Sequence, residues 1–334
     1  MEPIKYDHTV YTQTTKMRLI LRFLPSLFLA MALCADSFAL AAQTVQDEIG
    51  RPVCITGCPG RIVSMAPNIT EILYALGLES RIAGVTKFCN YPASAGSKPS
   101  IGGFVNPSIE KIVSLRPDLI IATADGNRKE TITRLEQMGL PVYVVKPTTV
   151  KGILETILHI GEITCSKEAA RSLTEGLNLR IHRVVALTKG LKKTRVFVQV
   201  GMDPIITVGR KTVINEIVTL AGGENVAGAQ EINYPRYSIE AVLGAAPDVI
   251  IISTMEWGGN VRRAKAFWRK WPQIPAVKNN RIQYLQADLL HRSSPRLIEG
   301  LEQLTRILHR EIGGSLPDEP CTAQTYPNPG DDIQ

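Results

Sequence analysis

Two glutamates stand at equivalent places in a repeated stretch of this sequence. Glu110 lies in the segment Phe104–Ile121, which carries an aromatic, Ser-Ile-Glu, Pro-Asp and then an apolar run. Glu240 lies in Tyr234–Ile251, where the aromatic again comes six residues before the glutamate and Pro-Asp seven residues after it. Serine favours the N-cap of a helix, and a carboxylate in the first turn suits the positive helix end. Each repeat therefore predicts a short helix that ends before a proline and leads into a buried strand.

Motifs for catalysis are missing from the sequence. It has no Gly-x-Ser-x-Gly, no His-Glu-x-x-His and no glycine-rich phosphate loop with its lysine. Gly222 and Gly223 follow a predicted helix, where a role as the helix end is favoured over phosphate binding. Only His291 of the five histidines lies in a predicted loop where a ligand could bind. Three others fall on predicted helices, at solvent-facing or core-edge positions: His159, His182 and His309. The sequence thus favours a binding protein over an enzyme, and it predicts no metal site.

The N-terminus is typical of a secretory signal peptide. A charged start precedes an apolar run at residues 23–33, and Ala-Leu-Ala ends at residue 41. The run is too short to span a bilayer comfortably. We therefore predict a signal peptide at residues 1–41, with residues 1–16 as an extension upstream of the true start. Leucine before Cys34 disfavours a lipid anchor, so we predict a soluble periplasmic protein.

Five cysteines remain after the predicted cleavage, and their pairing stays open. Cys54 and Cys58 could close a small disulfide loop in an oxidising compartment, or both could be free thiols. A metal site at these two is disfavoured, because no further ligands stand nearby to complete a tetrahedral shell. The other three are Cys89, Cys165 and Cys321. An odd count leaves at least one thiol unpaired or paired between molecules.

Size and composition indicate an ordinary globular protein with two lobes. The 334 residues exceed what one hydrophobic core usually serves, and 44% are apolar against 21% charged. The net charge of +7 is spread along the chain in short clusters without interleaved aromatics. That pattern is typical of a solvated surface, and we do not expect nucleic-acid binding.

Strands alternate with helices on both sides of a purely helical stretch. We predict an N-terminal lobe at 42–148, connecting helices at 149–190, a C-terminal lobe at 191–312 and a disordered tail at 313–334. The expected strands are 61–65, 82–85, 119–122, 142–145, 195–200, 249–252 and 282–285, with a hairpin at 47–53 in an otherwise exposed lead. The expected helices include 69–76, 128–138, 213–220, 261–268, 295–311 and one of some 24 residues from Ser166. This predicts an α/β protein with two Rossmann-like lobes, mainly parallel sheets and a single long helix joining them.

Ligands of open α/β sheets bind at the carboxyl ends of the strands. The loops expected there carry seven candidate residues: Tyr91, Phe104, Thr123, Ile206, Tyr234, Trp257 and Arg292. Two facing lobes would present these side chains across a mostly apolar cleft, which suits a large flat ligand. The alternative is that the aromatics only pack their own loops.

Three stretches resemble the helical-backbone class of periplasmic substrate-binding proteins: Arg61–Leu73, the two glutamate repeats, and Gly222–Asn225. The resemblance covers about residues 53–311 and is strongest to receptors of vitamin importers. It implies that the chain captures cobalamin or a related corrinoid and delivers it to an ABC importer. The class also includes receptors for haem and ferric siderophores, which is the alternative, with Tyr91, Tyr237 or His291 touching iron or its chelator. An extracytoplasmic enzyme is a further alternative.

The resemblance also assigns roles to single residues. The tyrosine before proline in the family corresponds to Tyr91, and its cleft arginine to Arg292. Four aromatic positions of the family correspond to Phe104, Tyr234, Thr123 and Ile206, of which only the first two remain aromatic here. Trp257 is interpreted as a nearby aromatic that compensates.

Glu110 and Glu240 resemble the family's docking carboxylates, one on each lobe. The resemblance implies that they meet arginines of the transmembrane permease, and that the free receptor is a monomer. Two separated acids would fix the orientation of docking and speed the encounter. Capping of the repeat helices is the alternative role, and the two roles are compatible.

Overall fold

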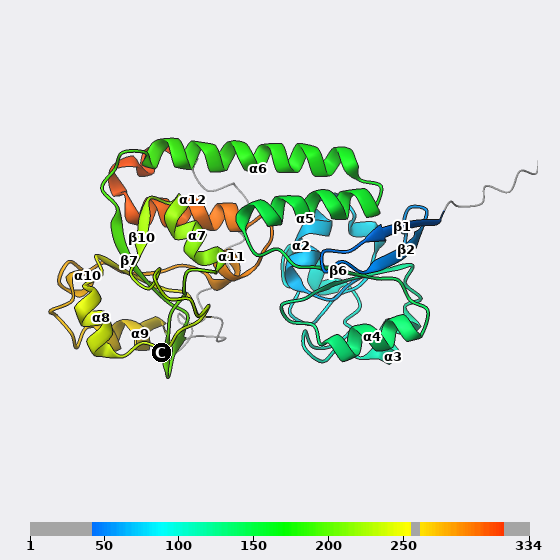
Figure 1. Ribbon diagram of the computed structural model, residues 1–334, viewed down its shortest axis with the longest axis horizontal. Helices are drawn as coiled ribbons and strands as arrows, with labels where there is room; N and C mark the ends of the chain where they lie inside the picture. Colours follow the sequence, from blue (N-terminus) through cyan, green and yellow to red (C-terminus); the bar gives the residue numbers. More distant parts are fainter. Residues whose placement is uncertain (1–41, 255–260, 317–334) are drawn as a thin grey trace, which may run out of the picture. The chain divides into compact units, whose positions relative to one another are not determined.

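The computed structural model describes residues 42–254 and 261–316, and it contains two parallel sheets of four strands each (Figure 1). The first sheet consists of β3 (Ile62–Ser64), β4 (Ile82–Gly84), β5 (Leu119–Thr123) and β6 (Val142–Val145). The second consists of β7 (Thr194–Gln199), β10 (Gly223–Asn225), β11 (Val249–Ile252) and β12 (Ile282–Tyr284). Trp257 falls in the gap between the two described ranges.

Both sheets have the same strand order. The first sheet runs β4-β3-β5-β6 and the second runs β10-β7-β11-β12. In each sheet, the strand that comes second along the chain (β4 or β10) lies at an edge, and the strand that comes first (β3 or β7) lies inside the sheet. Every neighbouring pair within the two sheets is parallel. The repeat seen in the sequence is therefore a repeat of topology, and the predicted pair of Rossmann-like lobes is confirmed.

The repeat helices begin where the sequence predicts. They are α3 (Ile109–Ser114) and α8 (Ile239–Ala245). The hydroxyl oxygens of their N-cap residues, Ser108 and Ser238, each accept a hydrogen bond of 3.2 Å from the backbone N–H three residues on. The helices end at equivalent places too, because Arg116 and Ala246, each directly before a proline, have φ values of 45° and 43°. Proline disfavours α conformation in the residue before it, which stops both helices.

Further helices cover the sheets. The first lobe adds α2 (Pro67–Ala75) and α4 (Lys129–Gln137). The second adds α7 (Val213–Leu220), α9 (Val261–Trp268), α10 (Pro275–Lys278), α11 (Ala287–His291) and α12 (Leu297–Leu308). Between the lobes come α5 (Val150–Ile163) and α6 (Lys167–Thr188). The helix predicted from Ser166 is thus α6, whose 22 residues span about 33 Å.

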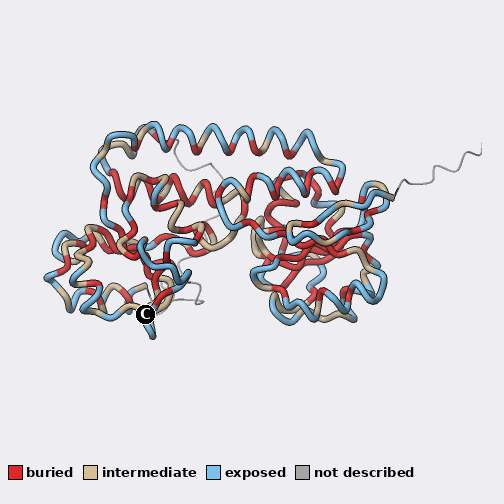
Figure 2. Tube along the Cα trace, viewed as in Figure 1, coloured by how far each residue is buried: buried red, intermediate tan, exposed pale blue. Residues whose placement is uncertain are grey.

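Alternate residues of each strand face opposite sides of the sheet, and the core is layered accordingly. In β5, Ile120 and Ala122 pack with α4 in one cluster, while Leu119 and Ile121 belong to another. This second cluster is the larger, and it continues through α5, α6, α7 and α12 to one face of the second sheet. Figure 2 shows buried residues along the sheets and the inner sides of these helices, with the outer side of α6 exposed. Helices and sheets of both lobes therefore share one apolar layer.

The segment before the first sheet is a hairpin, as predicted, formed by antiparallel β1 (Ala42–Gln46) and β2 (Pro52–Thr56). It is not simply an exposed lead, because Val53 and Ile55 are buried against the core. A disulfide joins Cys58 to Cys165, so the loop between Cys54 and Cys58 considered from the sequence is not formed. Cys54 is an exposed free thiol and Cys89 a buried one.

Two local expectations differ from the structure. Gly222 ends α7 with a φ of 76°, as a helix end requires, but the next residues form β10, which the sequence analysis missed. β10 is three residues long and contains Gly, Glu and Asn, so it lacks the apolar run that marks a strand. The predicted disordered tail begins too early, because a 3₁₀ helix spans Arg310–Ser315 and Leu316 is buried.

Candidate functional site

Arg292 lies at the end of α11 and reaches across to the first lobe. Its Nη1 donates to Glu71 Oε1 at 2.7 Å and to Asn90 Oδ1 at 2.8 Å. Its Nη2 lies 3.0 Å from Asp288 Oδ1 on α11 and 3.4 Å from the carbonyl oxygen of Phe88. Only 11% of the Arg292 side chain is exposed. The guanidinium is thus held by the loop after β4, by α2 and by its own helix.

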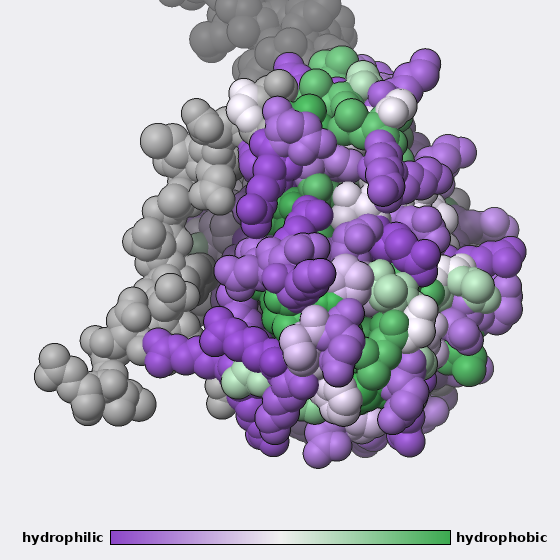
Figure 3. All heavy atoms as spheres, turned by 90° about the vertical axis from the view of Figure 1, so that its left-hand side faces the viewer, coloured by the Kyte–Doolittle hydropathy of each residue, from purple (hydrophilic) through white to green (hydrophobic). Residues whose placement is uncertain are grey.

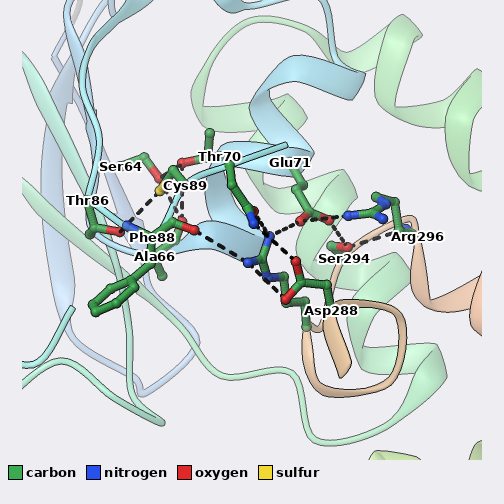
Figure 4. Close-up of polar contacts among 12 residues, drawn as sticks. Ser64, Ala66, Thr70, Glu71, Thr86, Phe88, Cys89, Asp288, Ser294 and Arg296 are labelled. Atoms are coloured by element: carbon green, nitrogen blue, oxygen red, sulfur yellow. Dashed lines mark hydrogen bonds and ion pairs between the residues drawn. The ribbon is translucent and has the colours of Figure 1, made fainter. Parts of the chain in front are cut away.

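Glu71 is the buried carboxylate in this arrangement, on α2 (Figure 4). The hydroxyl of Ser294 donates to its Oε2, and Arg296 Nη1 lies 3.5 Å from its Oε1. Burial raises the pKa of Glu71, while the charge of Arg292 and the hydrogen bond from Ser294 act in the opposite direction. All three neighbours are donors, so the carboxyl group serves as an acceptor only. We call Glu71, Asn90, Asp288, Arg292, Ser294 and Arg296 the Glu71 cluster.

Tyr91 is joined to the same cluster. The guanidinium of Arg296 lies 3.8 Å from the centre of the Tyr91 ring, which is partly buried. This cation–π contact holds the aromatic ring of one lobe against α12 of the other. Tyr91 and Arg292, two of the predicted site residues, are therefore brought together.

Phe104 and Thr123 meet at the carboxyl end of β5 through Asn127. The side-chain oxygen of Asn127 accepts a hydrogen bond of 2.8 Å from Thr123 N, and its nitrogen donates to the Phe104 carbonyl oxygen at 2.9 Å. The Phe104 ring lies over Gly126, where a Cβ atom would overlap the ring. Gly126 thus makes the position of this aromatic possible.

Ile206 and Tyr234 both lie in the second lobe. Ile206 lies on β9 (Ile205–Ile206), which pairs with β8 (Gly201–Met202) and forms a bridge to Arg236. Tyr234 is 53% exposed, and its pKa is raised by loss of hydration and then by the carboxylate of Asp125.

A pocket of about 670 Å³ lies beside Tyr234, between the segment 230–238 and the adjoining face of α8. Its lining comes from the second lobe alone. Figure 3 views the side on which α8 and α10 lie, where polar side chains cover most of the surface and apolar ones form smaller patches between them. Among the predicted ligand-site residues that the structure describes, Tyr234 is the one that contributes to this lining.

Glu110 and Glu240 are exposed, each in the first turn of its helix. The hydroxyl of Ser108 donates to Glu110 Oε2 at 2.9 Å. The pKa of each glutamate is lowered, first by its own backbone N–H and then by the serine two residues before it. The geometry accommodates both predicted roles, since an acceptor at a helix start remains accessible to a partner.

Several members of the Glu71 cluster were missed by the sequence analysis. The signal for Glu71 was available, because this carboxylate interrupts the apolar run of a helix at positions 69–73. Asn127, which joins Phe104 to Thr123, also gave a signal, since it follows Asp125-Gly126 shortly after the strand predicted at 119–122. His291 was expected in a loop but is the last residue of α11. Its Nε2 lies 3.0 Å from the Ser253 carbonyl oxygen, and burial lowers its pKa.

Within residues 42–254 and 261–316, no group of three or more His, Cys, Asp or Glu side chains is placed to hold a metal ion. None of the helices in these ranges has the length and apolar content that crossing a membrane requires.

A family model, a relative and two solved structures that this chain resembles are all of periplasmic or vitamin-binding proteins. The family model for periplasmic binding proteins matches residues 62–289. A vitamin B12-binding protein of Vibrio vulnificus is 32% identical over 245 residues, which is 73% of this chain and 88% of the relative. The crystal structure of a periplasmic vitamin B12-binding protein of Vibrio cholerae is 31% identical, with a TM-score of 0.68, over 75% of this chain and 97% of that one. A periplasmic haem-binding protein of Roseiflexus is 26% identical, with a TM-score of 0.68, over 75% and 98%.

Proposed function

Because this chain belongs to the periplasmic binding protein family, we propose that it is a receptor that captures vitamin B12 or a related corrinoid and delivers it to an ABC importer. The observation that carries the proposal is the similarity to vitamin B12-binding proteins over nearly their whole length. Family membership supports a role in binding a ligand in the periplasm without transforming it.

The arrangement of the candidate residues supports a large flat ligand. Phe104 and Tyr234 are aromatic and partly exposed, and they occupy equivalent places before the repeat helices of the two lobes. Burial and then the charge of Asp125, which follows β5, raise the pKa of Tyr234. Aromatic rings and apolar side chains would contact the faces and edges of a macrocycle, while polar groups would meet its side arms. The contribution of Trp257 lies outside the described residues and stays a prediction.

Docking and export complete the proposal. Exposed Glu110 and Glu240, one on each lobe, would meet arginines of the permease. Residues 1–41 would direct export as a cleaved signal peptide, and the mature chain would act as a soluble monomer. The disulfide between Cys58 and Cys165 supports an oxidising compartment.

Absorption spectroscopy tests the ligand directly. The chain exported from a Gram-negative host would be incubated with cyanocobalamin, haem or a ferric siderophore and then dialysed. We expect about one corrinoid per chain, with Kd below about 1 µM. Loss of all corrinoid on dialysis, with haem retained in its place, would replace this function by the haem alternative.

The haem alternative has support from one observation, the similarity to the haem-binding protein of Roseiflexus. Two of the three candidate iron contacts have other partners, however, and the third, Tyr237, lies in the lining of the pocket beside Tyr234 with its ring packed near Phe197. Arg296 covers the ring of Tyr91, and His291 is engaged with the carbonyl oxygen of Ser253. These two contacts support a corrinoid over a ligand whose iron is held by Tyr91 or His291.

A further inference from the structure

The charge of Arg292 is already balanced within the protein. Among the seven predicted ligand-site residues it is the one with a charged side chain. Its two nearest carboxylates, Glu71 and Asp288, lie 2.7 and 3.0 Å from its nitrogens. Arg296 Nη1 also lies 3.5 Å from Glu71 Oε1, so two cations face these two anions. The site arginine therefore offers no net positive charge to a ligand.

The hydrogen-bonding capacity of Arg292 is also largely used. A guanidinium has five N–H groups. Nη1 contacts two acceptors, Glu71 and Asn90, and Nη2 contacts two more, Asp288 and the Phe88 carbonyl oxygen. An anionic side arm of a ligand would have to displace one of these partners to form a charge-assisted pair. Displacing Glu71 would take its shortest ion pair from a buried carboxylate and leave it with Ser294 and the more distant Arg296, which is unfavourable.

We propose that the Glu71 cluster makes the ligand site select a chelate without net charge over a dianionic one, with Glu71 as the positioning residue that acts through Arg292. This inference rests on the proposed function and narrows its ligand class. A neutral amide arm needs no displacement, because it can donate to Asp288, whose side chain is 21% exposed.

Binding of two macrocyclic ligands to variants that each lack one carboxylate separates the effect of ligand charge from that of ligand shape. Cyanocobalamin is neutral overall and carries amide arms, whereas haem is a macrocycle with two carboxylates. The test measures the Kd of both ligands for the wild type, Glu71→Gln and Asp288→Asn at low and high salt. Glu130→Gln, at an exposed carboxylate on α4, is the matched control for removal of one negative charge.

The wild type should bind cyanocobalamin at least about 100-fold more tightly than haem. Glu71→Gln and Asp288→Asn should each raise the affinity for haem relative to cyanocobalamin by at least about tenfold, and the gain should shrink as salt screens the charges. Glu130→Gln should leave the ratio as it is. Thermal unfolding of each variant checks that the fold is intact, and the partly exposed Asp288 provides a test even if Glu71→Gln does not fold.

The inference would be overturned if folded Asp288→Asn kept the wild-type ratio of haem affinity to cyanocobalamin affinity. It would also be overturned if the wild type bound both ligands with equal affinity. Its failure can be told apart from failure of the proposed function. If the wild type binds cyanocobalamin but the substitutions leave the ratio of the two affinities constant, only the role of the Glu71 cluster is refuted. A wild type that binds no corrinoid, while both substitutions strengthen haem binding, refutes the corrinoid function and leaves the charge argument standing.

Discussion

Cys58 and Cys165 form a disulfide although 107 positions separate them in the sequence. The bond joins the segment after β2 to the turn between α5 and α6. It thereby ties the N-terminal hairpin region to the helices that connect the lobes. A cross-link over so long a loop restricts the unfolded chain considerably.

Replacing Cys58 by serine should lower the free energy of unfolding by about 2–5 kcal/mol, because the unfolded chain regains the freedom of the loop. Urea unfolding of the oxidised wild type and the variant measures this difference. Cys54→Ser is the control, since Cys54 is an exposed free thiol, and it should change the free energy by less than about 0.5 kcal/mol. Equal stability of the two variants would show that the disulfide contributes nothing.

Ser108→Ala and Ser238→Ala should each cost about 1 kcal/mol of unfolding free energy, because each removes the side-chain acceptor at the start of a repeat helix. Threonine retains the hydroxyl, so Ser108→Thr and Ser238→Thr should recover most of the loss. Urea unfolding is again the measurement. Alanine and threonine variants of equal stability would mean that the caps do not contribute.

Glu110→Ala combined with Glu240→Ala should reduce corrinoid uptake by cells at least about tenfold, since both charged contacts with the permease are lost. Ligand affinity of the purified receptor should stay within about twofold, because neither residue belongs to the ligand site. The control replaces two other exposed glutamates, Glu130 on α4 and Glu224 on β10. Impaired ligand affinity in the first double variant, or normal uptake, would contradict a docking role.

His159 predicts a pH-dependent contribution to stability. Its Nδ1 lies 3.1 Å from Glu48 Oε1, and this hydrogen bond raises its pKa above the ordinary value of 6.5. A raised folded-state pKa stabilises the protonated form, so the contribution is fully present below about pH 6.5 and is lost as the pH rises through the folded-state value.

The free-energy difference between the wild type and His159→Gln should therefore be larger at pH 5.5 than at pH 8.5. It should reach only about 0.5 kcal/mol, because the His159 side chain is 48% exposed and solvent screens the pair. Urea unfolding at the two pH values measures it. The same substitution made beside Glu48→Gln should lose the pH dependence; if the dependence persists there, another group is responsible.

Much of the fold could be predicted because it follows from local chemistry. Ser108 caps α3 through a backbone group three residues away, and the apolar run at Leu119 marks β5 by its composition alone. β10 escaped prediction since its Gly-Glu-Asn sequence has no apolar signal. Its pairing with β7 is what makes it a strand.

For the candidate site, some residues could be predicted from the sequence, but their partners could not. Resemblance identified Arg292 and Tyr91, and the topology of parallel strands explained why the loops after β4 and β5 matter. The partners of these residues could not be predicted, because Glu71 and Arg292 are 221 positions apart and meet only when helices of both lobes have packed.

The sequence by itself determined the two repeated α/β units, the start and end of their helices, and the types of side chain offered to a ligand. These properties depend on neighbours within a few positions, whose geometry the backbone sets. Only the tertiary structure decided that Cys58 bonds to Cys165 and that Arg292 is neutralised by buried Glu71. Such pairs depend on distances between remote segments, and the packing of the shared apolar layer sets those distances.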